Sequence, residues 1–455
     1  MDWKFGFRNA IATVGMSAGL ISGVVTHALA VPIEKLTSPS GIVAWISPDP
    51  TAKDITVMAT WRDGFDPKTS KRGLGEFALV MMGSGAGGLD EVDFKSAVQD
   101  LGSTIRVFNT EGPRIGLLLT AKPDKLDETV KLAHSLFSEP RFDPIDMMRV
   151  AKTMNNGMKS FFAAPQGKAQ YALWQVMRAN DPATKAVLKP GEELPKFDRA
   201  ELLSWHKQRF ARDSMTVSLA GAITSENAGQ IIDQLFAGIS EKSAVPDMPM
   251  ITYTGAGEVV DVPAESDQSI LIVAGPFLPD AGPDEGVEGA AGDVLADYVG
   301  NGNAGRLFKK IREEKGLSYG ITGNAGGGMR GTQFIISTSL PKDKAAEALA
   351  LVRETLDQVA KDGISDTDLA ATKERLRARH GKGLTSPTAI AGMLSSLQVK
   401  GRPIDHWDKY PDNVAQVTRE QVNELARTYL KPEKMTVVIV GDATGVKITR
   451  TFPVN

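Results

Sequence analysis

The sequence predicts an α+β fold that is built twice along one chain. The segments ARDSMTVSLAG at 211–221 and KPEKMTVVIVG at 431–441 share Met-Thr-Val, an apolar run and a glycine, at an offset of 220 residues. The segments at 121–137 and 340–356 share Asp-Lys at an offset of 219 residues. Because a constant offset at distant points indicates a duplication, we expect two homologous domains of roughly 200 residues each.

Each half combines strand patterns with helix patterns. Short apolar runs predict strands at 54–64, 114–122, 269–277 and 332–340. Apolar residues at helical spacing predict a helix in each half, at Leu126, Val130, Ala133 and Phe137, and at Leu349, Val352, Leu356 and Val359. Ser365 and Asp368 have the spacing of a capping box and predict the start of the next helix. We therefore expect a mixed β-sheet packed with helices in each half.

The two ends of the first half are indicated by composition. Lys4 and Arg8 precede an uncharged run from Ala10 to Val25, and the small residues Ala28-Leu29-Ala30 follow. This layout predicts a signal peptide at 1–30 and a periplasmic or secreted protein; a retained membrane anchor is the alternative. A stretch rich in Pro and Gly predicts a linker at 242–255, between an N-terminal domain at 31–241 and a C-terminal domain at 256–455.

Charge and cysteine content exclude several classes of function. The net charge of -3 does not favour binding to nucleic acid or to an anionic membrane surface. The chain has no cysteine, which excludes disulfides, thiolate zinc sites and cysteine nucleophiles.

The segment GRLFKKIREEKGLSYG at 305–320, together with the duplication, resembles the pitrilysin (insulinase) type of zinc peptidase. Mitochondrial processing peptidase and its two-subunit bacterial relatives are the most similar in layout. The resemblance covers essentially the whole chain after residue 30. It implies two halves arranged as a clamshell around a chamber that admits unfolded peptides.

In such peptidases the first half carries His-x-x-Glu-His on a helix, where two histidines hold zinc and the glutamate activates its water. The matching stretch here, GLGEFALVMMGSG at 73–85, has Glu76, Leu79 and Val80 at those three positions. The distal ligand position falls near Asn155–Asn156. We therefore expect no metal in this chain. The histidines after residue 30 have no ligand partners at suitable spacing and are interpreted as surface or helix-flank residues: His134, His206, His380 and His406.

The second half of such peptidases supplies an arginine and a tyrosine seven residues apart, which Arg312 and Tyr319 match. The resemblance implies that both side chains stabilise the oxyanion formed when zinc-bound hydroxide attacks a peptide carbonyl. Gly316 and Gly320 would let the backbone turn so that the two converge. The alternative is that Arg312 lies on a solvated helix face and Tyr319 is merely packed.

Gly300, Gly302 and Gly305 fit the G-x-G-x-x-G spacing. The preceding residues predict a helix rather than a strand, so a dinucleotide site is not favoured. The resemblance implies a glycine-rich loop that contacts substrate; a turn that ends a helix is equally compatible.

Two functions follow from these observations. In the first, the chain is the metal-free subunit of a zinc peptidase, and a homologous partner supplies His-x-x-Glu-His and the zinc. The partners would form a heterodimer or a pair of heterodimers that hydrolyses peptides. In the second, the chain is a catalytically inert structural or peptide-binding paralogue, because fold does not fix function.

Overall fold

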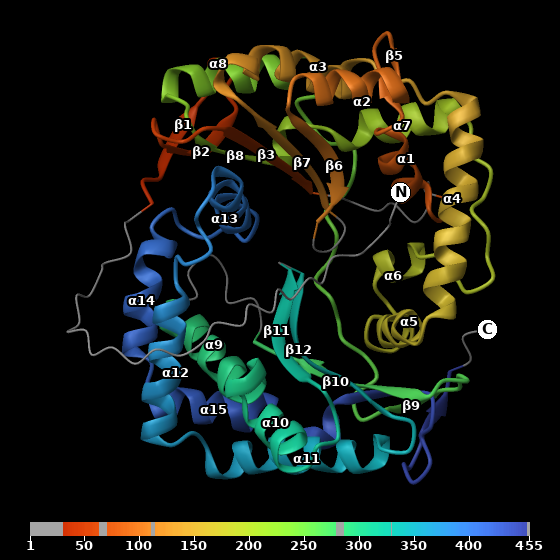
Figure 1. Cartoon of the computed structure of the whole chain (residues 1–455), viewed down its shortest axis with the longest axis vertical. Helices are drawn as coiled ribbons and strands as arrows, with labels where there is room; N and C mark the ends of the chain where they lie inside the picture. Colours follow the sequence, from red (N-terminus) through yellow and green to blue (C-terminus); the bar gives the residue numbers. More distant parts are fainter. Residues whose placement is uncertain (1–30, 63–70, 111–113, 279–285, 329, 453–455) are drawn as a thin grey trace.

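The computed structural model describes residues 31–62, 71–110, 114–278, 286–328 and 330–452, so the predicted signal peptide at 1–30 lies outside the described residues. Two six-stranded β-sheets lie at opposite ends of the molecule, with helices between them and around them (Figure 1). The predicted α+β fold with two similar halves is confirmed.

The two sheets share the pairing of five strands. Their orders are β1-β2-β8-β3-β7-β6 and β14-β9-β13-β10-β12-β11. In each, the parallel pair β2 with β8 or β9 with β13 adjoins a run of antiparallel strands. In the second sheet β14 also pairs with β9 in parallel. The first sheet comprises Glu34–Thr37, Val43–Pro48, Met215–Gly221, Ile55–Arg62, Arg114–Ala121 and Thr104–Asn109. The second comprises Arg450–Thr451, Val259–Val262, Thr436–Val440, Gln268–Pro276, Gly331–Pro341 and Ile321–Gly328. The repeated Met-Thr-Val segments form β8 and β13, which occupy the same place in the two sheets.

One helix from each half packs on the sheet of the other half. Helix α5 (Pro165–Met177) lies on β10 and β13, and α13 (Pro387–Val399) lies on β3 and β8. The contact of α5 is apolar, with Leu173 and Val176 among its buried side chains. The contact of α13 uses hydroxyl groups, because Thr60 Oγ1 lies 3.0 Å from Ser395 Oγ and Ser218 Oγ donates to the carbonyl of Ala391 at 2.9 Å.

This exchange buries the second sheet on both faces. Leu271 and Val273 of β10 face the core that the second half forms with its own helices. Ile270 and Ile272 of the same strand face α5. A strand that is covered on both sides needs apolar residues on both faces, which explains the apolar run from Ile270 to Ala274.

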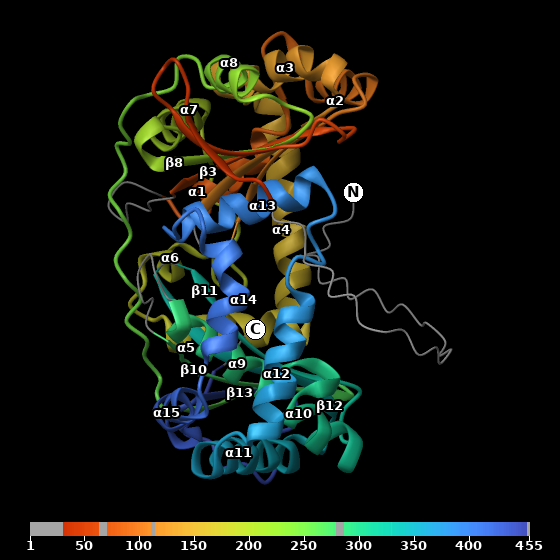
Figure 2. The same cartoon turned by 90° about the vertical axis from the view of Figure 1, so that its left-hand side faces the viewer.

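The outer faces of the sheets are covered by helices of their own half. Helices α3 (Leu126–Ser138) and α8 (Ser225–Leu235) cover the first sheet, and α11 (Ala345–Asp362) and α15 (Arg419–Tyr429) cover the second (Figure 1). The helices around the space between the sheets include α6 (Pro182–Ala186), α9 (Gly286–Gly300), α12 (Asp366–Arg379) and α14 (His406–Gln416). Figure 2 shows α12 and α14 linking the second half to α13. Among the described residues, no helix combines the length and apolarity that crossing a membrane would require.

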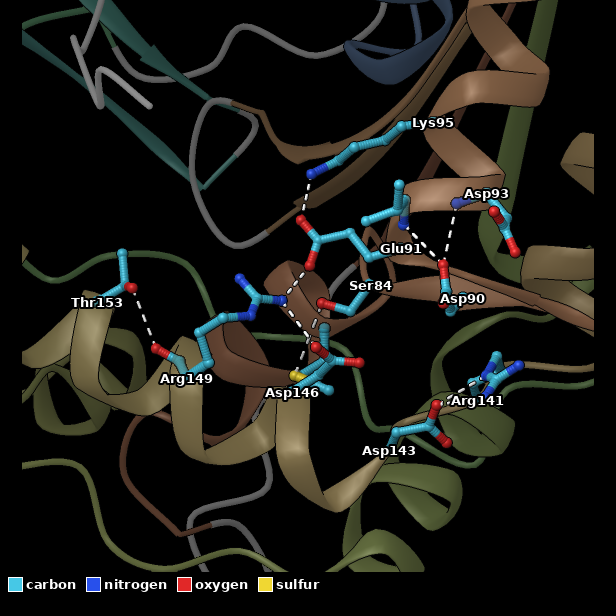
Figure 3. A network of polar contacts seen from close by, with 12 residues as sticks. Ser84, Asp90, Glu91, Asp93, Lys95, Arg141, Asp143, Asp146, Arg149 and Thr153 are labelled. Carbon is cyan, nitrogen blue, oxygen red and sulfur yellow. Dashed lines mark hydrogen bonds and ion pairs between the residues drawn. The ribbon is translucent and has the colours of Figure 1, made fainter.

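A network of ion pairs fixes the helices beside the degenerate metal motif. Glu91 at the start of α2 (Glu91–Asp100) pairs with Arg149 of α4 (Pro144–Ala163) and with Lys95 (Figure 3). Asp146 also pairs with Arg149, at 3.0 Å. Helix α4 in turn packs against α1 (Leu74–Met81), which carries the degenerate motif. Helix α7 (Arg199–Arg209) also packs against α1.

Candidate functional site

The segment that carries Arg312 is a π-helical turn. Helix α10 (Arg306–Phe308) continues into η4 (Lys309–Glu314), whose hydrogen bonds are wider than those of an α-helix. Gly316 then adopts φ +61°, a left-handed conformation that favours glycine, and reverses the chain toward β11. A solvated, charged helix face was the alternative interpretation of this segment. The sequence did not reveal the π-helical turn, a feature that is frequent at functional sites.

The structure brings Arg312 and Tyr319 together. The guanidinium carbon of Arg312 lies 5.8 Å from the centroid of the Tyr319 ring and 5.9 Å from that of Phe308. Its Nη1 donates to the carbonyl of Ser318 at 3.3 Å. The Tyr319 side chain is 93% exposed, and its hydroxyl makes no hydrogen bond within the described part of the chain. The phenol and the half-buried guanidinium are both hydrogen-bond donors, and both are accessible to a molecule that binds at this surface.

Ser318 fixes the turn that presents Tyr319. Its buried hydroxyl donates to the carbonyl of Gly320 at 2.8 Å and accepts from the N–H of the same residue at 3.1 Å. It also lies 2.7 Å from the hydroxyl of Thr338 on β12. The role of Ser318 was not apparent from the sequence, where its position directly before Tyr319 in Gly-Leu-Ser-Tyr was the only available signal.

Replacing Ser318 by alanine is expected to lower the free energy of unfolding by about 1–2 kcal/mol, because the change leaves buried polar groups without their partner. Urea denaturation of the two proteins measures the difference. Ser339→Ala is the matched control, since the hydroxyl of Ser339 makes no hydrogen bond in the described residues, and it should change stability by less than about 0.5 kcal/mol. Equal effects of the two substitutions would contradict the assigned role.

The three glycines before Arg306 lie between α9 and α10. A Cβ at Gly300 would approach the carbonyl oxygen of Gly323 to 2.0 Å, so this glycine allows α9 to pack closely on β11. Gly305 is similarly confined by the backbone of Asn301. Gly302, in a 3-10 turn at φ +38°, has open space around it. Packing thus explains two of the three glycines, and substrate contact by this loop stays a prediction.

The degenerate motif forms α1 as an ordinary helix. Leu79 is 6% exposed and belongs to the core of the first half, whereas Val80 is 40% exposed. The Glu76 side chain is accessible to solvent, yet enough protein surrounds it that desolvation raises the pKa of its carboxyl. Asn155 Oδ1 accepts the N–H of Leu194 at 2.9 Å, which gives that side chain a structural use.

Histidines do not gather into a metal site in the part of the chain that the structure describes, and no group of three or more His, Cys, Asp or Glu is suitably placed there. His134 hydrogen-bonds through Nδ1 to the carbonyl of Leu235 at 3.2 Å. The interpretation of His206 as a surface or helix-flank residue is wrong. It is 7% exposed in the core, and its Nε2 lies 2.9 Å from the carbonyl oxygen of Leu136.

Comparison with known families gives a match that begins near the end of the first half and extends into the second. Residues 196–376 match the family model described as "Peptidase M16 inactive domain". This part of the chain is similar to a peptidase M16 inactive domain. The resemblance to a pitrilysin-type chain is thereby confirmed, and the absence of His-x-x-Glu-His from α1 agrees with a match to an inactive domain.

Curated relatives of this chain are distant. An uncharacterized zinc protease of Mycobacterium tuberculosis is 25% identical over 257 residues, which cover 55% of this chain and 57% of the relative. The chain thus matches little more than half the length of this relative. The protein named non-peptidase homolog YmxG of Helicobacter pylori is 18% identical, over 81% of this chain and 84% of its own.

Solved structures share the whole fold of this chain. The peptidase M16 inactive domain from Pseudomonas fluorescens superposes with a TM-score of 0.83 at 19% identity, covering 93% of this chain and all of that one. A protease from Helicobacter pylori gives a TM-score of 0.77 at 14% identity, covering 90% and 99% of the two chains. At these identities the likeness establishes the fold alone.

Proposed function

We propose that this chain is the non-metal-binding subunit of a heteromeric zinc metallopeptidase. Arg312 and Tyr319 would act on a peptide bond that lies at the zinc site of a homologous partner. The observation that carries the proposal is the exposure of Tyr319 beside Arg312. A tyrosine retained for packing buries its ring, whereas this one extends into solvent from a turn fixed by Ser318.

The chemistry of the pair fits the stabilisation of an oxyanion. When bound in the partner, zinc supplies an activated water that attacks the peptide carbonyl. The Tyr319 hydroxyl can donate to the carbonyl oxygen as it gains negative charge. The guanidinium of Arg312 can donate to a neighbouring backbone carbonyl while its contact with Tyr319 holds the phenol in place. Donors that are fixed in advance stabilise the transition state most.

The proposal also covers the glycine-rich loop, the partner subunit and the cellular location of the protein. The open space around Gly302 supports contact between the glycine-rich loop and the backbone of a substrate, with Gly300 and Gly305 shaping the loop. The match to an inactive M16 domain supports pairing with an active M16 partner, as a heterodimer or a pair of heterodimers. The charge pattern of residues 1–30 supports export to the periplasm or beyond.

The relative named as a non-peptidase homolog favours the second candidate, a catalytically inert structural or peptide-binding paralogue. Mixing separates the two functions. The purified chain is combined with an exported M16 chain that carries His-x-x-Glu-His, and cleavage of a fluorescence-quenched peptide is followed. Hydrolysis that requires both chains supports the proposed function. A mixture no more active than the partner alone supports the inert paralogue.

A further inference from the structure

A second polar site lies where α13 leaves the second half. Helices α9, α12, α13 and α14 enclose a cavity of about 490 Å³, which neither Arg312 nor Tyr319 lines. Its polar lining consists mainly of Asp293, Arg379, His380, Lys400, Arg402 and Tyr410. A cavity of this size accommodates a small ligand or a short piece of peptide.

Positive charge dominates this cavity. Three cations, Arg379, Lys400 and Arg402, line it against one carboxylate, Asp293. The next carboxylate along α9, Asp297, is only 3% exposed and is engaged by Arg375 at 2.8 Å and by Arg379. It therefore offers little negative charge to the cavity.

The single lining carboxylate already accepts a hydrogen bond. Asp293 Oδ2 accepts the hydroxyl of Tyr410 at 2.9 Å. Burial raises the pKa of Asp293, and the Tyr410 hydrogen bond and the charge of Lys400 oppose that rise. The exposed Lys400 side chain has no hydrogen bond or ion pair within the described residues, so its ammonium is available to an anion from outside.

An aromatic wall faces these cations. The His380 ring stacks on Trp407, with centroids 4.1 Å apart, and lies parallel to Tyr410 at 5.4 Å. Burial lowers the pKa of His380, so the ring is neutral at pH 7 and serves as a stacking surface rather than as a charge. Met393 and Leu397 of α13 add apolar surface.

A ligand that suits this cavity carries one anionic group beside an apolar or aromatic group. We propose that the cavity between α9, α12, α13 and α14 binds the carboxyl-terminal residue of a peptide. The terminal carboxylate would be held by Lys400 and Arg379, and the side chain of that residue would pack on Trp407 and His380. Charge-assisted hydrogen bonds give the selectivity for a free carboxylate. The proposal rests on the proposed function only because peptide hydrolysis would supply the ligand. The binding itself needs neither zinc nor a partner.

Calorimetric titration of the chain alone tests the proposal. The probes are N-acetyl-Ala-Ala-Phe with a free carboxylate and the same tripeptide as its amide. We expect the acid to bind one-to-one and the amide to bind at least tenfold more weakly. Lys400→Gln should weaken the acid at least fivefold and leave the amide unchanged, because it removes a cation without disturbing the core. Lys361→Gln, a change of an exposed lysine on α11, is the matched control and should alter neither affinity.

Three results would overturn the proposal: equal affinity for acid and amide, unchanged acid binding by Lys400→Gln, or inorganic phosphate binding as tightly as the peptide acid. The last would define a simple anion site. The outcome is separable from the proposed function. If the acid binds selectively but the subunit mixture is inactive, only the peptidase role is rejected. If the mixture is active but the acid does not bind selectively, only the proposal for the cavity is rejected.

Discussion

Replacing Tyr319 by phenylalanine in the reconstituted peptidase lowers kcat/KM by about 10²- to 10³-fold, and Arg312→Ala does the same. Each substitution removes one donor to the developing oxyanion or to the adjoining carbonyl, which is worth about 2.7–4 kcal/mol of barrier. Because the donors act in the transition state, the loss falls on kcat while KM changes little. Initial-rate kinetics on a fluorescence-quenched peptide, at equal subunit concentrations, measure both constants.

Arg306→Ala is the matched control for this experiment. Arg306 lies on the same segment, but its guanidinium is turned to the ring of Tyr298, 6.0 Å away. This variant should retain activity within about twofold, since a surface substitution away from the site has little effect. If Arg306→Ala and Arg312→Ala reduced activity equally, the segment would matter only for subunit contact.

Acidification is expected to destabilise the chain through His206. Burial lowers the pKa of this histidine to about 4, although the hydrogen bond to the Leu136 carbonyl acts to raise it. In the unfolded chain the pKa returns to about 6.5, so the unfolded state binds more protons between these two values. The contribution of His206 is fully present above about pH 6.5 and is lost as the pH falls toward about 4. By pH 5 the loss in the free energy of unfolding amounts to about 2 kcal/mol.

The variant His206→Gln isolates this contribution. Glutamine retains an N–H donor for the Leu136 carbonyl but does not titrate, so its loss of stability between pH 7 and pH 5 should be about 2 kcal/mol smaller than that of the wild type. His134→Gln replaces another histidine bonded to a backbone carbonyl and is the matched control for the substitution itself. Urea denaturation at both pH values supplies the comparison. An unchanged pH dependence in His206→Gln would rule out this source of acid sensitivity.

The duplication and the Arg–Tyr segment could be predicted from the sequence. The two Met-Thr-Val segments, which revealed the offset, form strands β8 and β13, and these strands hold equivalent places in the two sheets. The spacing of Arg312 and Tyr319 is equally visible, since both belong to one short, continuous stretch. The absence of the metal motif on α1 needed only the identities of Glu76, Leu79 and Val80.

Features that depend on contacts between distant segments could not be predicted. The apolar face of α5 predicts that the helix is buried. It does not predict which sheet covers that face, because periodicity carries no information about the partner surface. The π-helical turn at Arg312 arises where the chain must pack on α9 and α11 and then reverse at Gly316. Helices α9, α12, α13 and α14, which come from separate stretches of the chain, enclose the cavity beside His380, so no local pattern reveals it.

The affinity of a phosphinic peptide, a mimic of the tetrahedral intermediate, tests the central claim most directly. Its dissociation constant is measured on reconstituted pairs that contain either the wild-type chain or Tyr319→Phe. If this chain reaches into the zinc site of its partner, the mimic should bind the variant pair at least tenfold more weakly, while the substrate KM stays within about twofold. Equal affinity of the mimic for both pairs would show that Tyr319 makes no contact with the intermediate.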